Sequence, residues 1–171
     1  GAEANEGALK LAKYVTKRPA VISFKGSFHG RTMGTAAITG SNSAYRKNYE
    51  PMVPSTYFLE YPNLFRSPYT NDGVHCPQQY FDQFDSLFSQ LVDPSMVAAI
   101  IMEPIQGEGG YIVPPVEFVQ YVRKVCDTHG IMLIFDEVQT GFGRTGKMFA
   151  YEHFGVKPDI MSTAKALGAG F

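Results

Sequence analysis

The chain has 171 residues, of which 44% are hydrophobic and 18% are charged. This composition is typical of a soluble globular protein with one substantial core and argues against disorder. The formal net charge is −1 and the positive residues are scattered, so the basic footprint of a nucleic-acid or membrane-surface binder is excluded. The longest apolar run, residues 96–102, is too short to span a bilayer. Cys76 and Cys126 have neither metal-ligand nor CxxC spacing, and they favour a reducing compartment, with the cytoplasm as the default.

The first half of the chain predicts two helices, one strand and a long irregular segment. Residues 2–18 carry small and apolar side chains at helical spacing, so we expect a helix that begins at or just before Gly1. Residues 20–24 form a short apolar run typical of a strand. Residues 40–80 are rich in Pro, Tyr, Asn and Ser and predict an irregular excursion over the surface. Residues 80–91 have the pattern of an amphipathic helix.

The strongest signals come from two continuous apolar runs, residues 97–102 and 131–135. The absence of polar alternation indicates strands buried on both faces, as in a parallel sheet. Residues 115–129 lie between them and have a helical pattern, with a proline at the start and Gly130 just past the end. The order strand, helix, strand predicts an α/β fold with a doubly wound, mostly parallel sheet.

An acidic residue ends each of these two predicted strands. Glu103 ends the first and is followed by a glycine-rich loop at 104–110, and Asp136 ends the second, before the loop at 137–146. Ligands of such sheets gather beyond the carboxyl ends of the strands. Either acid alone could cap a helix or hold a loop, but two on one edge with glycine-rich loops predict a binding site.

The second of these loops also matches two nucleotide-binding patterns. Residues 141–146 fit GxGxxG, and residues 141–147 fit GxxxxGK. The dinucleotide pattern should lie directly between a strand and a helix, yet the strand already ends at Asp136. The phosphate-loop pattern needs Ser or Thr after its lysine to hold magnesium, and Met148 cannot do this. Both nucleotide interpretations are therefore disfavoured.

Lys165 lies in a run of small residues, 162–171, near the end of the chain. Small neighbours let the backbone and a flat ligand approach closely, and an amine in such a pocket can lose its proton and form a Schiff base. Most lysines are solvated surface charges, so the interpretation of Lys165 depends on the motifs around it.

Five motifs stand in order along the chain: GAEANEGA at 1–8, FHGRT at 28–32, EPIQGEGG at 103–110, DEVQTGFGRTG at 136–146, and PDI with a following AK at 158–165. In this order they resemble the motifs of the class III, or omega-type, pyridoxal-phosphate aminotransferases. Family chains are much longer, and the ends of this chain also suggest an internal piece. The resemblance implies that residues 1–171 are the central part of the large cofactor-binding domain of a fold-type I enzyme, without the N-terminal segment and the C-terminal small domain.

The resemblance implies a role for four residues that would hold the cofactor, pyridoxal 5'-phosphate (PLP). Lys165 would form the Schiff base and move the proton of the substrate. Asp136 would bind the pyridine nitrogen and keep it protonated, because an opposite charge nearby favours the ionised form. Gly1 and Ala2 would bind the phosphate through backbone N–H groups at the start of the first helix.

Three further residues surround these in the family pattern. Phe28 and Val138 would pack on the two faces of the cofactor ring, and Gln139 would hydrogen-bond its phenolic oxygen. We interpret Glu103 as structural and His29 as a loop histidine whose hydrogen bonds are satisfied.

Two charged residues are implied in substrate binding. Arg31 would grip a substrate carboxylate, a task suited to its planar bidentate donor group. Glu108 would pair with a second arginine that lies outside this chain and would release it when a dicarboxylic substrate arrives. Together they favour 2-oxoglutarate as the amino acceptor.

The amino donor is expected to be an omega-amine. Gln139 argues against the related aminomutases, which resemble this chain less in the DEVQTG stretch. The excursion between residues 40 and 94, with the EGGYIVPP stretch at 108–115 that follows it, resembles 4-aminobutyrate aminotransferases more than acetylornithine or ornithine ones, which remain an alternative. The family implies a homodimer for the full-length protein, with no metal, nucleic acid or membrane. A non-catalytic fold fragment or binding module is the alternative from a different class.

Overall fold

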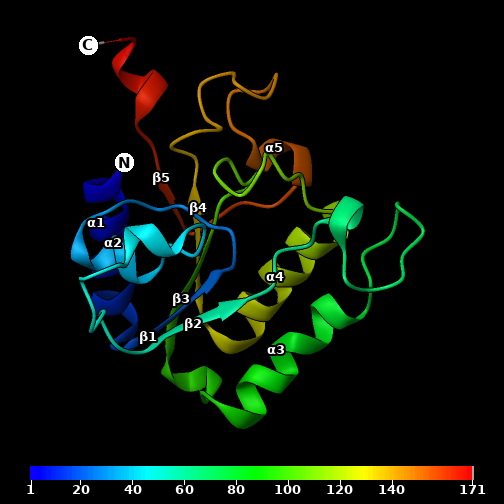
Figure 1. The fold of residues 1–171 in the computed structure, drawn as a ribbon, viewed down its shortest axis with the longest axis horizontal. Helices are drawn as coiled ribbons and strands as arrows, with labels where there is room; N and C mark the ends of the chain where they lie inside the picture. Colours follow the sequence, from blue (N-terminus) through cyan, green and yellow to red (C-terminus); the bar gives the residue numbers. More distant parts are fainter. Residues whose placement is uncertain (171) are drawn as a thin grey trace.

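The computed structural model describes residues 1–170 and shows a parallel sheet covered by helices (Figure 1). The described part of the chain has five strands in the order β2-β1-β3-β4-β5, and every neighbouring pair is parallel. They are β1 (Ala20–Phe24), β2 (Thr56–Leu59), β3 (Val97–Met102), β4 (Met132–Asp136) and β5 (Ile160–Ser162). The predicted doubly wound α/β fold is confirmed.

Five helices accompany these strands in the described part of the chain, and the three that the sequence predicted agree with their predicted ranges to within about two residues. The five are α1 (Ala2–Thr16), α2 (Met33–Ala37), α3 (Gln79–Gln90), α4 (Val116–His129) and α5 (Tyr151–Phe154). Four single 3₁₀ turns complete the set: η1 (Ser43–Tyr45), η2 (Leu64–Arg66), η3 (Pro94–Met96) and η4 (Lys165–Gly168). Helix α1 ends two residues before the predicted position because Lys17 adopts a left-handed conformation and its N–H bonds the Lys13 carbonyl.

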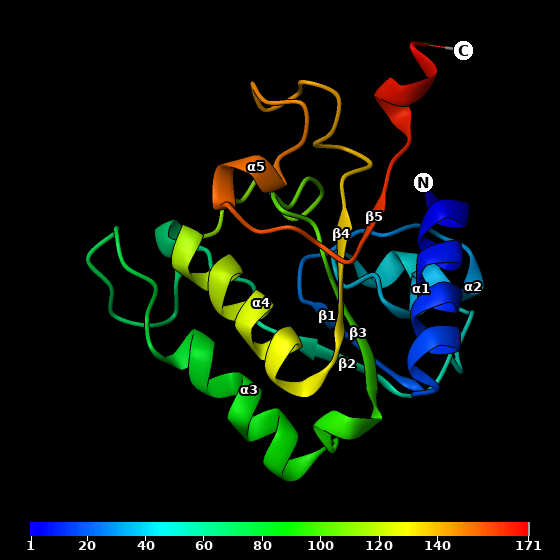
Figure 2. The same cartoon turned by 180° about the vertical axis from the view of Figure 1, so that it is seen from behind.

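Helices lie on both faces of the sheet, with α1 and α2 on one side and α3 and α4 on the other (Figures 1 and 2). Along β3, Ala99 and Ile101 belong to the hydrophobic cluster that includes α1, whereas Ile100 and Met102 belong to the cluster on the α3 and α4 face. Alternate side chains of a strand point to opposite faces. Both faces are covered, which explains why β3 and β4 have no polar alternation.

Two strands, β2 and β5, and two helices, α2 and α5, were not predicted. Strand β2 lies within the expected excursion and pairs with β1 from Val21 and Thr56 to Phe24 and Leu59. It is an edge strand, and most of its residues are only half-buried. Strand β5 has three residues, and helix α2 has five. The prediction of a wholly irregular 40–80 segment is therefore wrong in this part.

The strand order reverses direction between β1 and β3, near the centre of the sheet. After β1 the chain moves outward to β2 and then returns to β3 on the other side of β1. Loops on opposite sides of such a reversal diverge and leave a crevice at the carboxyl ends of the strands. Within residues 1–170, no helix is long and apolar enough to cross a membrane, and no group of His, Cys, Asp and Glu side chains is arranged to hold a metal ion.

Candidate active site

A cavity of about 610 Å³ opens at the carboxyl edge of the sheet. Its walls come from the start of α1, the loop after β1, the loops after β3 and β4, and the segment after β5. Eight of the nine predicted site residues line it: Gly1, Ala2, Phe28, Glu108, Asp136, Val138, Gln139 and Lys165. Cavities of this size accommodate small ligands and cofactors.

Asp136 is a buried carboxylate that lines the cavity, with 4% of its surface exposed. Its Oδ2 accepts hydrogen bonds from Asn5 Nδ2 at 2.7 Å and from His29 Nδ1 at 2.8 Å. Its Oδ1 accepts a third from the Val138 N–H at 3.0 Å. A buried carboxylate is tolerated only with such partners. Three donors from three segments hold the carboxylate in one orientation at the cavity wall.

His29 is buried beside Asp136, and only one of its ring nitrogens has a partner. Nδ1 faces Asp136, and the His29 N–H donates to Thr39 Oγ1 at 3.0 Å. The other nitrogen, Nε2, is buried and has no hydrogen-bond partner among residues 1–170. The interpretation of His29 as a fully satisfied loop histidine is therefore wrong. Because Nδ1 donates its proton to the carboxylate, a neutral ring presents Nε2 as an acceptor.

Lys165 and Gln139 are brought together across the cavity. Lys165 begins η4, three residues after the end of β5, and its Nζ donates a hydrogen bond to Gln139 Oε1. Lys165 has a φ of 41°, which is uncommon for a residue with a side chain. Such backbone strain often accompanies functional positions.

Glu103 joins two loops that form the cavity. Its Oε1 accepts from the Phe28 N–H at 2.9 Å, and its Oε2 accepts from the Gly107 N–H at 3.0 Å. Burial raises the pKa of Glu103, and the His29 ring and these two N–H groups oppose part of that rise. The contacts agree with the structural role predicted for Glu103.

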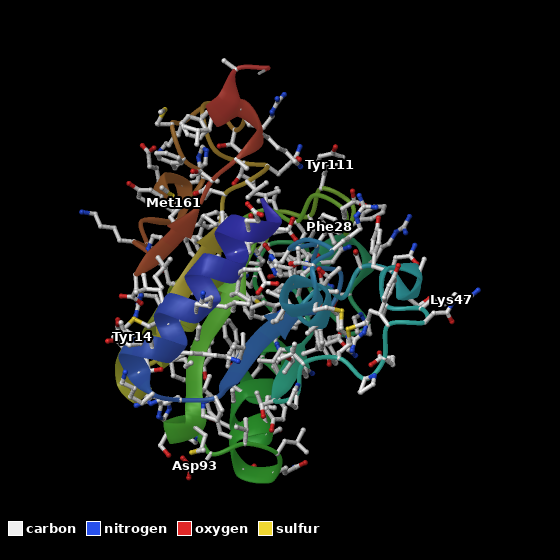
Figure 3. The ribbon with its side chains drawn as sticks, turned by 90° about the vertical axis from the view of Figure 1, so that its left-hand side faces the viewer. Tyr14, Phe28, Lys47, Asp93, Tyr111 and Met161 are labelled. Atoms are coloured by element: carbon white, nitrogen blue, oxygen red, sulfur yellow. The ribbon has the colours of Figure 1, made fainter. Side chains whose placement is uncertain are left out.

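Phe28 is half-buried, and its ring packs edge-to-face on Tyr45, with ring centroids 5.1 Å apart. Figure 3 shows Phe28 and Tyr111 at the same end of the molecule, while Tyr14 and Asp93 lie toward the opposite end. Phe28 therefore stands at the carboxyl edge of the sheet, supported by an aromatic neighbour.

Gly1 is the N-cap of α1 and lies against Val138. A Cβ added at Gly1 would lie 3.5 Å from Val138 Cγ1, an ordinary contact distance. The protein atoms alone do not require glycine here. Gly30 differs, because its φ is 133° and an added Cβ would lie 2.6 Å from the Ala2 Cβ. Gly30 is thus the residue that lets the loop after β1 pass close to the start of α1.

Arg31 is the predicted site residue that the structure does not bring into the cavity. It is exposed and lies outside the cavity lining. Glu108 is exposed as well, but it lines the cavity. The substrate roles of both residues stay predictions.

Asn5 lines the cavity and was missed by the sequence interpretation. The available signal was its position four residues after Gly1, which places both on the same face of α1. That face carries the predicted phosphate-binding turn at one end and packs on the sheet, where a polar side chain needs hydrogen-bond partners.

The whole chain, residues 1–171, matches the family described as aminotransferase class-III. The chain belongs to the class III aminotransferases. It is 46% identical to the diaminobutyrate–2-oxoglutarate aminotransferase of Haemophilus influenzae, over 98% of this chain and 37% of that protein. It is 42% identical to a probable 4-aminobutyrate aminotransferase of Bacillus subtilis, over 99% of this chain and 39% of that protein.

A solved structure of the family has the same fold. It is the taurine:2-oxoglutarate aminotransferase of Bifidobacterium kashiwanohense, in complex with PLP and glutamate. The TM-score is 0.90 at 37% identity, and the match covers 100% of this chain and 39% of the other. This class III aminotransferase chain thus spans less than two fifths of the length of these relatives.

Proposed function

We propose that these residues form the central part of the large PLP-binding domain of a transaminase, which moves an amino group from an omega-amino donor to 2-oxoglutarate. The observation that carries the proposal is that one cavity holds both the Lys165 amine and the buried Asp136 carboxylate. Family membership and the PLP in the taurine:2-oxoglutarate aminotransferase support it.

The cavity residues fit the chemistry of PLP. Its phosphate suits the backbone N–H groups of Gly1 and Ala2 at the start of α1. Phe28 and Val138 offer apolar surfaces for the ring. Asp136 is held by three donors on its two oxygens, so the remaining acceptor capacity of the carboxylate suits a protonated ring nitrogen.

When bound, PLP supplies an aldehyde that bonds covalently to amines and a ring that withdraws electrons from the substrate. The protein supplies binding, orientation and proton transfer. Asp136 would hold the positive ring nitrogen. The Lys165 amine would take the proton from the amine-bearing carbon of the substrate and deliver it to the aldehyde carbon of the cofactor. Gln139, which accepts a hydrogen bond from Lys165, would orient the amine and hydrogen-bond the phenolic oxygen of the cofactor.

We assign 2-oxoglutarate as the acceptor and favour 4-aminobutyrate as the donor. Two of the compared proteins have 2-oxoglutarate in their names, and one is named for 4-aminobutyrate. Arg31 is the proposed carboxylate-binding residue, and Glu108 is proposed to pair with a second arginine outside this chain and to release it when a dicarboxylic substrate arrives. Acetylornithine or ornithine is the alternative donor, and a non-catalytic fragment is the alternative from another class. We also propose that the full-length protein is a cytoplasmic homodimer that uses no metal.

The cofactor assignment is tested with the full-length protein and added PLP. We expect visible absorbance from bound PLP, its loss in Lys165→Ala, and permanent attachment of the cofactor to Lys165 after borohydride reduction. Lys157→Ala is the matched control, because Lys157 is an exposed lysine outside the cavity. Labelling of another lysine, or unchanged absorbance in Lys165→Ala, would refute the assignment.

The donor is tested by a panel of amines with 2-oxoglutarate. The panel contains 4-aminobutyrate, diaminobutyrate, acetylornithine and taurine, and glutamate formation is measured. We expect the highest kcat/KM with 4-aminobutyrate. A higher value for acetylornithine would overturn the donor assignment but leave the transaminase intact, whereas no turnover with any amine would support the non-catalytic alternative.

A further inference from the structure

Asn5 makes three side-chain hydrogen bonds in the interior of the site. It has 1% of its surface exposed. Its Nδ2 donates to Asp136 Oδ2 at 2.7 Å and to the His29 carbonyl oxygen at 2.8 Å. Its Oδ1 accepts a hydrogen bond from Ser162 Oγ at 2.6 Å. Both protons of the amide nitrogen and the amide oxygen are thus used.

The chemistry of these partners determines the direction of the amide. The His29 carbonyl oxygen can only accept, so the NH₂ group must face it. The same NH₂ group then faces Asp136, and the oxygen faces Ser162, whose hydroxyl must donate. An aspartate at position 5 would instead place a third acceptor against the other two. Among similar side chains, only an amide supplies both donors and the acceptor.

These contacts join the three segments that build the proposed cofactor site. Asn5 belongs to α1, the helix whose first residues line the cavity. Asp136 ends β4 and Ser162 ends β5, and the two residues pair in the sheet. The Glu137 N–H donates to the Ser162 carbonyl at 3.0 Å and continues this pairing. The chain then runs three residues to Lys165.

We propose that Asn5 is the positioning residue of this site. Its amide orients the Asp136 carboxylate toward the ring nitrogen. Through Ser162, it also fixes the end of β5, and so the distance between Asp136 and Lys165, which follows three residues later. The inference rests on the proposed PLP-dependent function. It assigns Asn5 to the chemistry through Asp136 and Ser162 and not through contact with the substrate.

The test uses the full-length protein with PLP and the variants Asn5→Leu and Ser162→Ala. Leu has nearly the same size as Asn but cannot hydrogen-bond. We expect Asn5→Leu to weaken PLP binding by about tenfold or more, because a hydrogen bond to a charged group is lost inside the protein. The visible absorbance maximum of bound PLP and its pH dependence should shift as well, because Asp136 then holds the ring nitrogen less well.

Ser162→Ala keeps the Asn5–Asp136 contact and removes only the hydroxyl that anchors the Asn5 oxygen. We expect Ser162→Ala to shift the absorbance maximum of bound PLP in the same direction as Asn5→Leu, but by less. The effects of the two substitutions on PLP affinity and spectrum should be less than additive in the double variant, because both substitutions act on one hydrogen-bond network. Ser23→Ala is the matched control. Ser23 is fully buried, and its Oγ donates to the Ile38 carbonyl at 2.7 Å, but it lies outside the cavity.

The outcomes separate this inference from the proposed function. If the wild-type protein shows PLP absorbance and Asn5→Leu keeps the same affinity, spectrum and pH dependence, the positioning role is refuted while the function stands. The same holds if Ser23→Ala changes the spectrum as much as Asn5→Leu does. If Asn5→Leu fails to fold, a wild-type spectrum in Ser162→Ala refutes the inference. A wild-type protein that binds no PLP overturns both proposals.

Discussion

Asp136→Asn tests whether the negative charge of Asp136 is needed for activity without being needed for folding. The substitution keeps the shape of the side chain but replaces one acceptor oxygen with an NH₂ group. In the structure, Oδ2 accepts from Asn5 and His29, and Oδ1 accepts from Val138. The new amide keeps the most hydrogen bonds when its oxygen occupies the Oδ2 position. Its NH₂ group then faces the Val138 N–H, and one hydrogen bond is lost.

The cost to folding is therefore that of one hydrogen bond with donors left unsatisfied, about 1–3 kcal/mol. This is below the roughly 5–15 kcal/mol that stabilises a typical protein, so we expect Asp136→Asn to fold. The cost to catalysis is larger, because the ring nitrogen loses its anionic partner. We expect kcat/KM to fall by on the order of 10²-fold or more, by analogy with the contribution of acid-base groups.

The assay compares full-length wild-type and Asp136→Asn proteins by circular dichroism, by thermal unfolding without PLP, and by glutamate formation from 4-aminobutyrate and 2-oxoglutarate. Wild-type turnover in Asp136→Asn would refute the assigned role of the carboxylate. If Asp136→Asn does not fold, the estimate that folding loses only one hydrogen bond is refuted, since the three donors would then require a negative charge at this position.

Three further predictions concern other parts of the cavity. Gly30→Ala should destabilise the protein by more than about 1 kcal/mol, because φ is 133° and the added Cβ would lie 2.6 Å from the Ala2 Cβ. Thermal unfolding compares this variant with the control Gly7→Ala, where an added Cβ meets nothing within 4 Å. Equal changes in stability for the two variants would contradict the prediction. Glu103 has a pKa above its ordinary value of 4.5, so the folded state binds this proton more readily than the unfolded state, and stability should fall as pH rises through the window above 4.5. Urea unfolding of the PLP-free protein between about pH 4 and 7 should show a flatter pH dependence for Glu103→Gln, and parallel profiles would be inconsistent with a raised pKa. Phe28→Ala should weaken PLP binding by about three- to tenfold through lost ring packing. The control is Phe65→Ala, which should leave the affinity unchanged because Phe65 is 91% exposed. The affinities are measured by titration of visible absorbance, and equal affinities for wild type and Phe28→Ala would count against stacking.

The parts of the fold that could be predicted are those where burial leaves a continuous signal. Strand β3 was predicted with its observed bounds, and β4 to within a residue, because a sheet covered on both faces needs apolar side chains at every position. Strand β2 could not be predicted in the same way. It lies at the edge, most of its residues are half-buried, and its backbone pairs with β1 on one side. Strand β5 is too short for any periodicity.

The site shows the same division. Glu103 and Asp136 were predicted at the carboxyl edge because parallel strands end together, and the structure confirms their place in one cavity. The partners of Asp136 depend on how α1 docks on the sheet and on how the loop after β1 turns back. No local pattern in the sequence reports either arrangement, so the contacts of Asn5 and His29 were not predicted. Arg31 illustrates the limit of a motif, which identifies a residue type but not where its side chain lies.

The hydrogen bond between Ser162 and Asn5 has a consequence for the order of folding, because it joins residues 157 positions apart. Contacts of such long separation form only after intervening segments have closed their loops. The bond can form only when β5 has added to the edge of β4, and β5 is the last strand described. Completion of the cofactor cavity thus requires β5, and a ribosome-bound chain that ends before residue 160 would lack this hydrogen bond.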